Sequence, residues 1–146
     1  MSGQEATQTI YTLGTGLRSR KEFVEILLSH GIEVMVDVRC MPCSKLPNFS
    51  RQGIEEIACS NGLGYVFLSR ELGGLRTGGY TAYMATDAFA EAVDRLEEIG
   101  RNSITAFICA ERLPWKCHRK WISLELKRRG WPVRHIIDKD HAWEPQ

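Results

Sequence analysis

Two thiols, a carboxylate, an imidazole and guanidinium groups lie within one short segment of this chain. The segment runs from Cys109 to Arg119 and contains Glu111, Cys117 and His118. An apolar run typical of a strand precedes it, and a stretch typical of an amphipathic helix begins at residue 114. Amide groups at the start of a helix bind anions and favour the thiolate form of cysteine. We therefore expect the chemistry of the protein in this segment.

Cys109 is the first candidate for a reacting group. At the end of a strand and near cations it fits a nucleophile or a redox thiol, and a small buried apolar side chain is the other interpretation. Glu111 is placed for acid or base catalysis. A disulfide between Cys109 and Cys117 is left open, but the spacing does not suggest one because Cys117 is predicted to lie inside a helix.

The elements that position this segment follow from the hydrophobic periodicity. Serine at the start and glycine at the end bound the first two predicted helices, at Ser19 with Gly31 and at Ser50 with Gly62, and Gly100 closes the third. The predicted strands are 9–13, 32–38, 64–68, 103–108 and 133–137, and the predicted helices are 19–30, 50–59, 89–99 and 114–129. Because parallel strands need crossover connections, this alternation predicts an α/β fold: a three-layer sandwich with a mainly parallel sheet of about five strands and helices on both faces.

Polar motifs follow four of the predicted strands. In a parallel sheet, ligands bind beyond the carboxyl ends of the strands, so these motifs are expected to form one composite pocket. Glu71 is a second candidate for the acid or base there. The motifs are Gly14 with Thr15, Asp37 with Arg39, Arg70 with Glu71, and Cys109 with Glu111.

Three arginines are predicted to bind an anion in this pocket. Arg39 shares a strand face with Asp37 and offers a bidentate fork, although a simple ion pair between the two is the other interpretation. Arg51 lies near a predicted helix start, where it can equally be an exposed surface residue with no role in binding. Arg119 follows His118 in the first turns of the last helix, whose N-terminal potential adds to its charge. Asp37 and His118 are counted with the arginines as substrate-binding residues.

The glycine-rich segment 69–81 predicts a mobile flap, because glycine permits unusual backbone angles. Tyr80 and Tyr83 could stack on a base or a sugar, and Tyr83 is counted among the substrate-binding residues. An ordinary long loop with aromatic anchors is the alternative interpretation.

A metal site has little support in the sequence. Cys40 and Cys43 have the spacing of zinc ligands, but no second pair exists, and adjacent residues such as Cys117 and His118 seldom reach one ion together. We therefore predict no metal site, and the sequence identifies no cofactor. Spacing does not test whether a hard cation such as magnesium is held over a phosphate by Asp37, Glu71 and Glu111.

The composition fits one domain over 1–146 with a core at about 9–137. The chain has 146 residues, 43% of them hydrophobic, with 19 basic and 18 acidic side chains. No apolar run reaches the roughly 20 residues that cross a bilayer. The start lacks a signal-peptide pattern and five cysteines cannot all pair, so we expect a cytoplasmic protein with reduced thiols and no membrane partner. The tail from residue 139 is expected to be loosely held.

Several ordered motifs carry a resemblance to a known family. They are Cys109-Ala-Glu111, Pro114 and Cys117-His-Arg119, with Thr12-Leu-Gly14, Val36-Asp-Val-Arg39, Phe49-Ser-Arg51, Glu71-Leu-Gly-Gly74, and Tyr80 with Tyr83. Over roughly residues 9–137 the chain resembles the family called domain of unknown function 488. The resemblance implies no settled reaction, and it places Thr15 where members usually carry a histidine.

Two classes of function fit these residues. The first is an enzyme acting on a phosphorylated small molecule, a nucleotide or a nucleic-acid end, held by the arginines. The second is a non-catalytic module that binds a nucleotide or a nucleic acid, although the net charge of +1 gives little nonspecific affinity for nucleic acid. A sulfurtransferase of the rhodanese type is the weaker third hypothesis, because Pro114 supplies no amide to a persulfide-binding loop. Phosphatase chemistry is disfavoured since Trp115 stands where the loop needs an arginine. The oligomeric state does not follow from the sequence.

Overall fold

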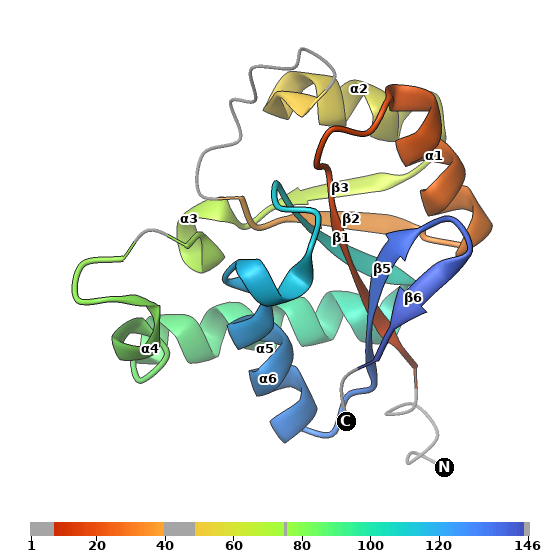
Figure 1. The fold of residues 1–146 in the computed structure, drawn as a ribbon. Coiled ribbons are helices and arrows are strands. Elements are labelled where there is room, and N and C mark those ends of the chain that lie inside the picture. Colours follow the sequence, from red (N-terminus) through yellow and green to blue (C-terminus); the bar gives the residue numbers. More distant parts are fainter. Residues whose placement is uncertain (1–7, 40–48, 75, 145–146) are drawn as a thin grey trace.

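The computed structural model describes residues 8–39, 49–74 and 76–144. Its centre is one sheet with the strand order β3-β2-β4-β1-β5-β6 (Figure 1). The first five strands are parallel and β6 runs antiparallel to β5. The strands are β1 (Ile10–Gly14), β2 (Val34–Asp37), β3 (Gly64–Phe67), β4 (Thr105–Cys109), β5 (Val133–Asp138) and β6 (His141–Trp143). The α/β prediction with a mainly parallel sheet is confirmed.

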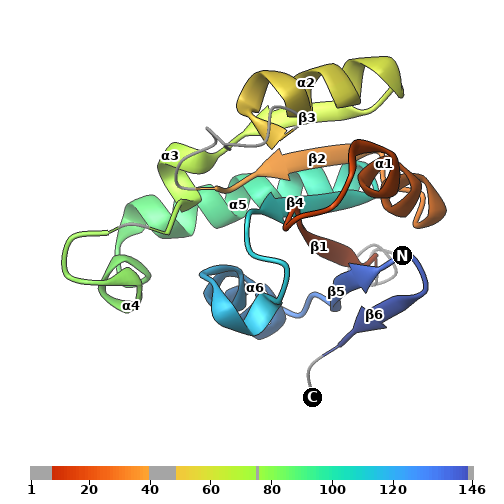
Figure 2. The same cartoon turned by 45° about the horizontal axis from the view of Figure 1, so that its top comes forward.

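Helices cover both faces of the sheet (Figure 2). One apolar cluster joins the sheet to α1 (Arg20–Ser29) and α2 (Arg51–Ser60), and includes Leu13, Phe23 and Ile54. The other cluster joins it to α5 (Asp87–Asn102) and α6 (Arg119–Arg128), and includes Phe107 and Leu126. Short helical turns complete the layer formed by α5 and α6. They are α3 (Ser69–Leu72), α4 (Tyr80–Tyr83) and the 3-10 helix η3 (Pro114–Lys116).

The first two helices begin where the serines predict. The Ser19 hydroxyl accepts from the amide of Glu22 at 3.0 Å, and the Ser50 hydroxyl accepts from the amide of Gly53 at 3.0 Å. Such a cap contributes about 1 kcal/mol to helix stability. Beyond the helix ends, Gly31 and Gly62 have φ angles of 69° and 70°, which glycine adopts without strain.

Gly100 does not end α5 as predicted, since the helix continues to Asn102. A Cβ atom at position 100 would lie 2.9 Å from Cδ1 of Ile10 and 3.4 Å from the Trp131 ring. The glycine therefore allows close packing of the helix against the sheet, and its role as a helix terminator was a wrong prediction.

The predicted helix 114–129 is also wrong in one respect, because it is broken before α6. Cys117 has an extended backbone, with φ −143° and ψ 175°, between η3 and the start of α6 at Arg119. Cys117 therefore lies outside the helix in which the sequence placed it.

The glycine-rich segment contains helical turns where the sequence predicted a loop. The Tyr80 hydroxyl donates to the Leu72 carbonyl at 3.0 Å and the Tyr83 hydroxyl donates to the Glu71 carbonyl at 2.6 Å. The Arg76 guanidinium lies 3.8 Å from the centre of the Tyr83 ring. Both tyrosines therefore anchor the segment to α3.

The tail differs from the prediction as well. Residues 141–143 form the edge strand β6, paired with β5 through His135–Trp143 and Ile136–Ala142. Part of the tail that the sequence predicted to be loosely held thus forms a strand. None of the helices in the described ranges is long and apolar enough to span a bilayer.

The connections after β1 and β4 leave toward opposite faces of the sheet. These strands are neighbours, with Gly14 in register with Cys109. The chain after β1 leads to α1 on one face, and the chain after β4 leads to η3 and α6 on the other (Figure 1). In open α/β sheets such a topological switch point opens a crevice in which ligands bind.

Candidate functional site

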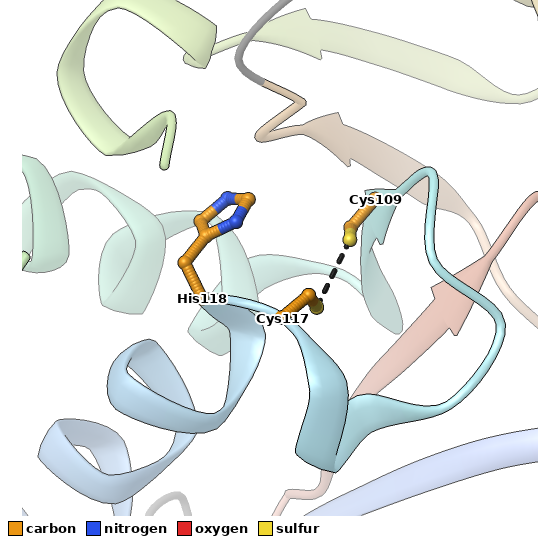
Figure 3. A group of neighbouring side chains, drawn as sticks. All are labelled: Cys109, Cys117 and His118. Carbon is orange, nitrogen blue, oxygen red and sulfur yellow. Dashed lines mark hydrogen bonds between the residues drawn. The ribbon is translucent and has the colours of Figure 1, made fainter. Parts of the chain in front are cut away.

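The thiols of Cys109 and Cys117 meet at the carboxyl end of β4. Cys109 is the last residue of that strand and is 3% exposed, and Cys117 is half-buried just before α6. The Cys109 thiol donates a hydrogen bond to the Cys117 sulfur over 3.1 Å (Figure 3). The spacing of the two cysteines did not suggest this contact, which depends on the break before α6.

Cys117 is the more acidic thiol of the pair. The hydrogen bond from Cys109 is the largest cause that lowers the pKa of Cys117, to about 5, and the charge and hydrogen bonds of Arg119 add to it against the effect of burial. The Arg119 amide and its Nε both donate to the Cys117 sulfur at 3.3 Å. The hydrogen bond to Cys117, followed by burial, raises the pKa of Cys109. These opposite directions favour the thiolate on Cys117 and the proton on Cys109.

Arg119 holds the thiolate and the loop before it together. Its guanidinium is fully buried and donates to the Thr12 hydroxyl at 3.0 Å and to the carbonyls of Glu111 and Arg112 at 2.6 and 3.2 Å. The same loop lies directly on β1, where a Cβ at Gly14 would come within 2.0 Å of the Glu111 carbonyl oxygen. Glycine at this position is required for the close approach.

His118 lies beside the dithiol formed by Cys109 and Cys117. Its Nε2 lies 2.7 Å from the Val38 carbonyl, so it donates to that oxygen, and its ring packs at 5.5 Å from the Tyr80 ring. Burial lowers the pKa of His118, which keeps the ring neutral at physiological pH. A side chain at Gly74 would lie 2.8 Å from Nδ1. The glycine therefore leaves room for the imidazole.

Asp37 and Arg39 form a buried ion pair. The Nε and Nη2 atoms of Arg39 each lie 2.8 Å from an Asp37 carboxylate oxygen, and the Tyr65 hydroxyl donates to the same carboxylate at 2.6 Å. Arg39 also donates to the Phe49 carbonyl. Burial is the largest single effect and opposes the charged guanidinium, but the hydrogen bond and the charge of Asp37, together with Tyr65, exceed it and raise the pKa of Arg39. This geometry matches the simple ion pair that the sequence left as the alternative to anion binding.

The other predicted site residues lie around this centre with partners of their own. The Arg51 guanidinium lies 3.8 Å from the centre of the Phe67 ring and 3.9 Å from Glu55, on the surface. Glu71 is exposed on α3, where its carbonyl holds Tyr83. Glu111 is half-buried and accepts from the Leu113 amide at 3.2 Å. The structure thus brings Cys109, Cys117, His118 and Arg119 together, and the anion-binding roles of the arginines stay predictions.

An open cavity of about 420 Å³ lies between the loops that follow β1 and β4. Its walls are Gly16, Leu17, Ala110, Glu111 and Arg112. This is the switch point of the sheet. The cavity there places Glu111, the predicted acid or base, beside the exposed side chain of Arg112.

The dithiol offers the ligand types that zinc prefers. One ligand atom each of Cys109, Cys117 and His118 lies within 4.8 Å of the others. The Nε2 atom of His118 already donates to a carbonyl, however, so only Nδ1 could bind a metal, and Gly74 packs against that atom. The Cys40 and Cys43 pair lies outside the described residues.

Sequence reasoning missed two members of the site. It identified Cys109 as the reacting thiol and did not use Cys117, although the Cys-His-Arg run before a helix was visible. Thr12, which accepts from Arg119, is an interior strand residue with no local signal of its role.

The chain was compared with known proteins. A model of the family described as "Domain of unknown function DUF488" matches residues 19–126, which is well over half of the chain. This range includes β2 to β4 and nearly all of α6, and therefore the complete dithiol. The searches of curated proteins and of solved structures gave no match.

Proposed function

We propose that this chain, which belongs to the DUF488 family, is a thiol–disulfide exchange enzyme that reacts through Cys117. One observation carries the proposal: the Cys117 sulfur, which accepts hydrogen bonds from Arg119, lies 3.1 Å from the thiol of Cys109. A thiolate is the nucleophile in disulfide exchange, and a neighbouring thiol can resolve the mixed disulfide. The two cysteines supply one group for each of these steps.

The first step uses the thiolate. The Cys117 sulfur attacks one sulfur of a substrate disulfide, a bond forms between Cys117 and that half of the substrate, and the other half leaves with the bonding electron pair and takes a proton from water. Arg119 stabilises the negative charge on Cys117 before the attack, because its amide and Nε point at the sulfur.

The second step uses Cys109. Loss of its proton makes it a nucleophile, and it attacks the Cys117 sulfur of the mixed disulfide. A Cys109–Cys117 disulfide forms and the second substrate thiolate leaves. The substrate gains two electrons, which the dithiol loses, and an external thiol reductant returns the protein to its starting state. The leaving substrate thiolate takes up the proton that Cys109 loses, so the step balances.

Trapping of the mixed disulfide tests this proposal. With oxidised glutathione as the substrate, the Cys109→Ser protein should accumulate one glutathione on Cys117, because its resolving thiol is gone. The wild-type protein should instead form the internal disulfide, and Cys117→Ser should form neither. Mass spectrometry of the peptides separates these products. Equal glutathionylation of Cys59, an exposed free thiol, would reject a special role for Cys117.

A second candidate function is action on a phosphorylated small molecule, a nucleotide or a nucleic-acid end. The cavity at the switch point favours it, since Glu111 and Arg112 line that space together. Thermal shift against inorganic phosphate, nucleotides and sugar phosphates measures binding, because a ligand of the native state raises the melting temperature. Loss of the shift in Arg112→Ala would support this candidate. If Glu111→Gln keeps the shift and no turnover is found in either protein, a non-catalytic binding module is the better description.

A further inference from the structure

A second cavity, whose walls do not include the two thiols, is lined by two tryptophans. It has a volume of about 310 Å³ and lies between η3, α6, β5 and β6. The Trp115 and Trp143 rings meet edge to face with centres 5.4 Å apart, and Trp143 stacks on His135 at 5.4 Å. The two indoles are 47% and 39% exposed. Exposed aromatic surface around a concavity is typical of a ligand site and unusual for a free surface.

A buried hydroxyl on a residue that lines this cavity has no hydrogen-bond partner in the described part of the chain. Ser123 lies on α6, is 3% exposed and lines the cavity. Its Oγ makes no hydrogen bond to any of the described residues. Buried polar atoms in native proteins are almost always satisfied, so an unpaired hydroxyl on a residue that lines a cavity is a candidate to bond to a ligand atom or a water there.

The charged side chains of the cavity have one sign. Lys120 and Lys127 line it, and among the described residues no acidic side chain does. His135 adds no charge, because burial is the main cause that lowers the pKa of His135 to about 4. The space therefore combines stacking surfaces, one unpaired hydrogen-bonding group and positive charge at its edge.

We propose that this cavity binds a planar aromatic anion of one or two rings, such as an aromatic carboxylate. The rings would lie against Trp115 and Trp143, the carboxylate would face Lys120 and Lys127, and Ser123 would hydrogen-bond to a polar ligand atom. The volume is near the lower end of the range for small-molecule sites, about 300 to 1,000 Å³, which fits a ligand of this size. The proposal does not depend on the thiol chemistry, since Cys117 is not among the residues that line the cavity.

Binding of 2-naphthoate tests the proposal, with neutral 2-naphthamide as the matched ligand. We expect saturable quenching of tryptophan fluorescence by the carboxylate, and weaker binding of the amide. Lys120→Ala should weaken binding of the carboxylate by up to about five-fold, the effect of losing one exposed charge contact, and should leave binding of the amide unchanged. Trp143→Ala should remove binding of both. Lys21→Ala, an exposed change on α1 across the sheet, is the control and should bind as the wild type does.

Three results would overturn the proposal. The first is the absence of saturable binding at millimolar 2-naphthoate in the wild-type protein. The second is equal binding by the wild type and Trp143→Ala, with native folding of the variant shown by circular dichroism. The third is a wild-type dimer in sedimentation that Trp143→Ala converts to a monomer, because a second copy would then cover the tryptophans.

Discussion

At the scale of single residues, the position of one proton between Cys109 and Cys117 decides which sulfur reacts. Residue types alone pointed to Cys109, since a cysteine at a strand end near cations fits a nucleophile. The three-dimensional contacts favour Cys117, because Arg119 bonds to its sulfur and Cys109 donates to it. The sequence therefore located the segment that carries the reactive residues. Which of the two cysteines reacts depends on distances between side chains, which the spacing in the sequence does not give.

Removal of the Cys109 thiol should make Cys117 less acidic. Its hydrogen bond is the largest cause of the lowered pKa, so the pKa of Cys117 in Cys109→Ala should rise from about 5. The pH dependence of alkylation of the Cys117 peptide measures the change. Cys59→Ser removes an exposed thiol elsewhere and should leave the Cys117 profile as in the wild type. A profile that is the same in Cys109→Ala and wild type would show that Cys109 does not acidify its neighbour.

The acidic Cys117 should also make stability depend on pH. In the folded protein its pKa is lowered to about 5, whereas an unfolded cysteine ionises near about 8.5. The folded state thus binds fewer protons between these values, so its stabilisation is complete above the upper value and is lost as the pH falls toward the lower one. The raised pKa of Cys109 acts only above this window.

Urea unfolding of the reduced protein and of Cys117→Ser checks this dependence. The difference in free energy of unfolding between the two should grow in favour of the wild type from pH 5 to pH 8. A difference that stays constant over this range would contradict a folded-state thiolate at Cys117.

At the scale of elements, the site depends on how closely the loop after β4 approaches β1. Gly14→Ala would place a methyl group 2.0 Å from the Glu111 carbonyl oxygen, and the loop must move. Overpacking of this kind typically destabilises by about 1–3 kcal/mol. Because the displaced loop carries carbonyls that Arg119 holds, alkylation of Cys117 should also shift to higher pH.

Gly64→Ala is the matched control at the start of β3. The three atoms nearest to its new methyl group would all belong to the Val34 side chain, at 3.2 Å or more. Thermal unfolding should show a smaller loss than Gly14→Ala, with the Cys117 profile unchanged. Equal effects of the two variants would argue against the loop contact as the specific requirement.

The elements also show what sequence patterns convey well and what they do not. Periodicity and serine caps located α1, α2 and the five parallel strands, because these features are local. The break at Cys117 and the continuation of α5 through Gly100 were missed, since the first is stabilised by Arg119, which hydrogen-bonds to Thr12 of β1, and the second by packing on Ile10. Both depend on residues distant in sequence or on tertiary packing, which overrides local propensity.

At the scale of the whole molecule, an ion-pair cluster fastens α5 to α6 on the face opposite α1 and α2. Arg129 pairs with Asp94 and Glu97 at 2.7 Å and with Glu125 at 2.8 Å. The Trp131 indole donates to Glu97 at 2.7 Å. The cluster belongs to the scaffold, since it lies at the far end of α6 from the dithiol (Figure 1).

Arg129→Ala should therefore destabilise the fold without changing the chemistry. We expect a loss of about 1–3 kcal/mol in thermal or urea unfolding, because two largely buried carboxylates, Glu97 and Glu125, lose their shared partner. Alkylation of Cys117 should keep its pH profile. Arg101→Ala, an exposed change near the end of α5, is the control and should have little effect on either measurement. A shifted Cys117 profile in Arg129→Ala would mean that scaffold and site are not independent.

The measurement that tests the account most directly is the rate of alkylation of each cysteine in the reduced wild-type protein as a function of pH, followed peptide by peptide. The account predicts that Cys117 reacts with a midpoint near pH 5 and before Cys109. A midpoint near about 8.5, the value of an ordinary thiol, or reaction of Cys109 ahead of Cys117, would contradict it.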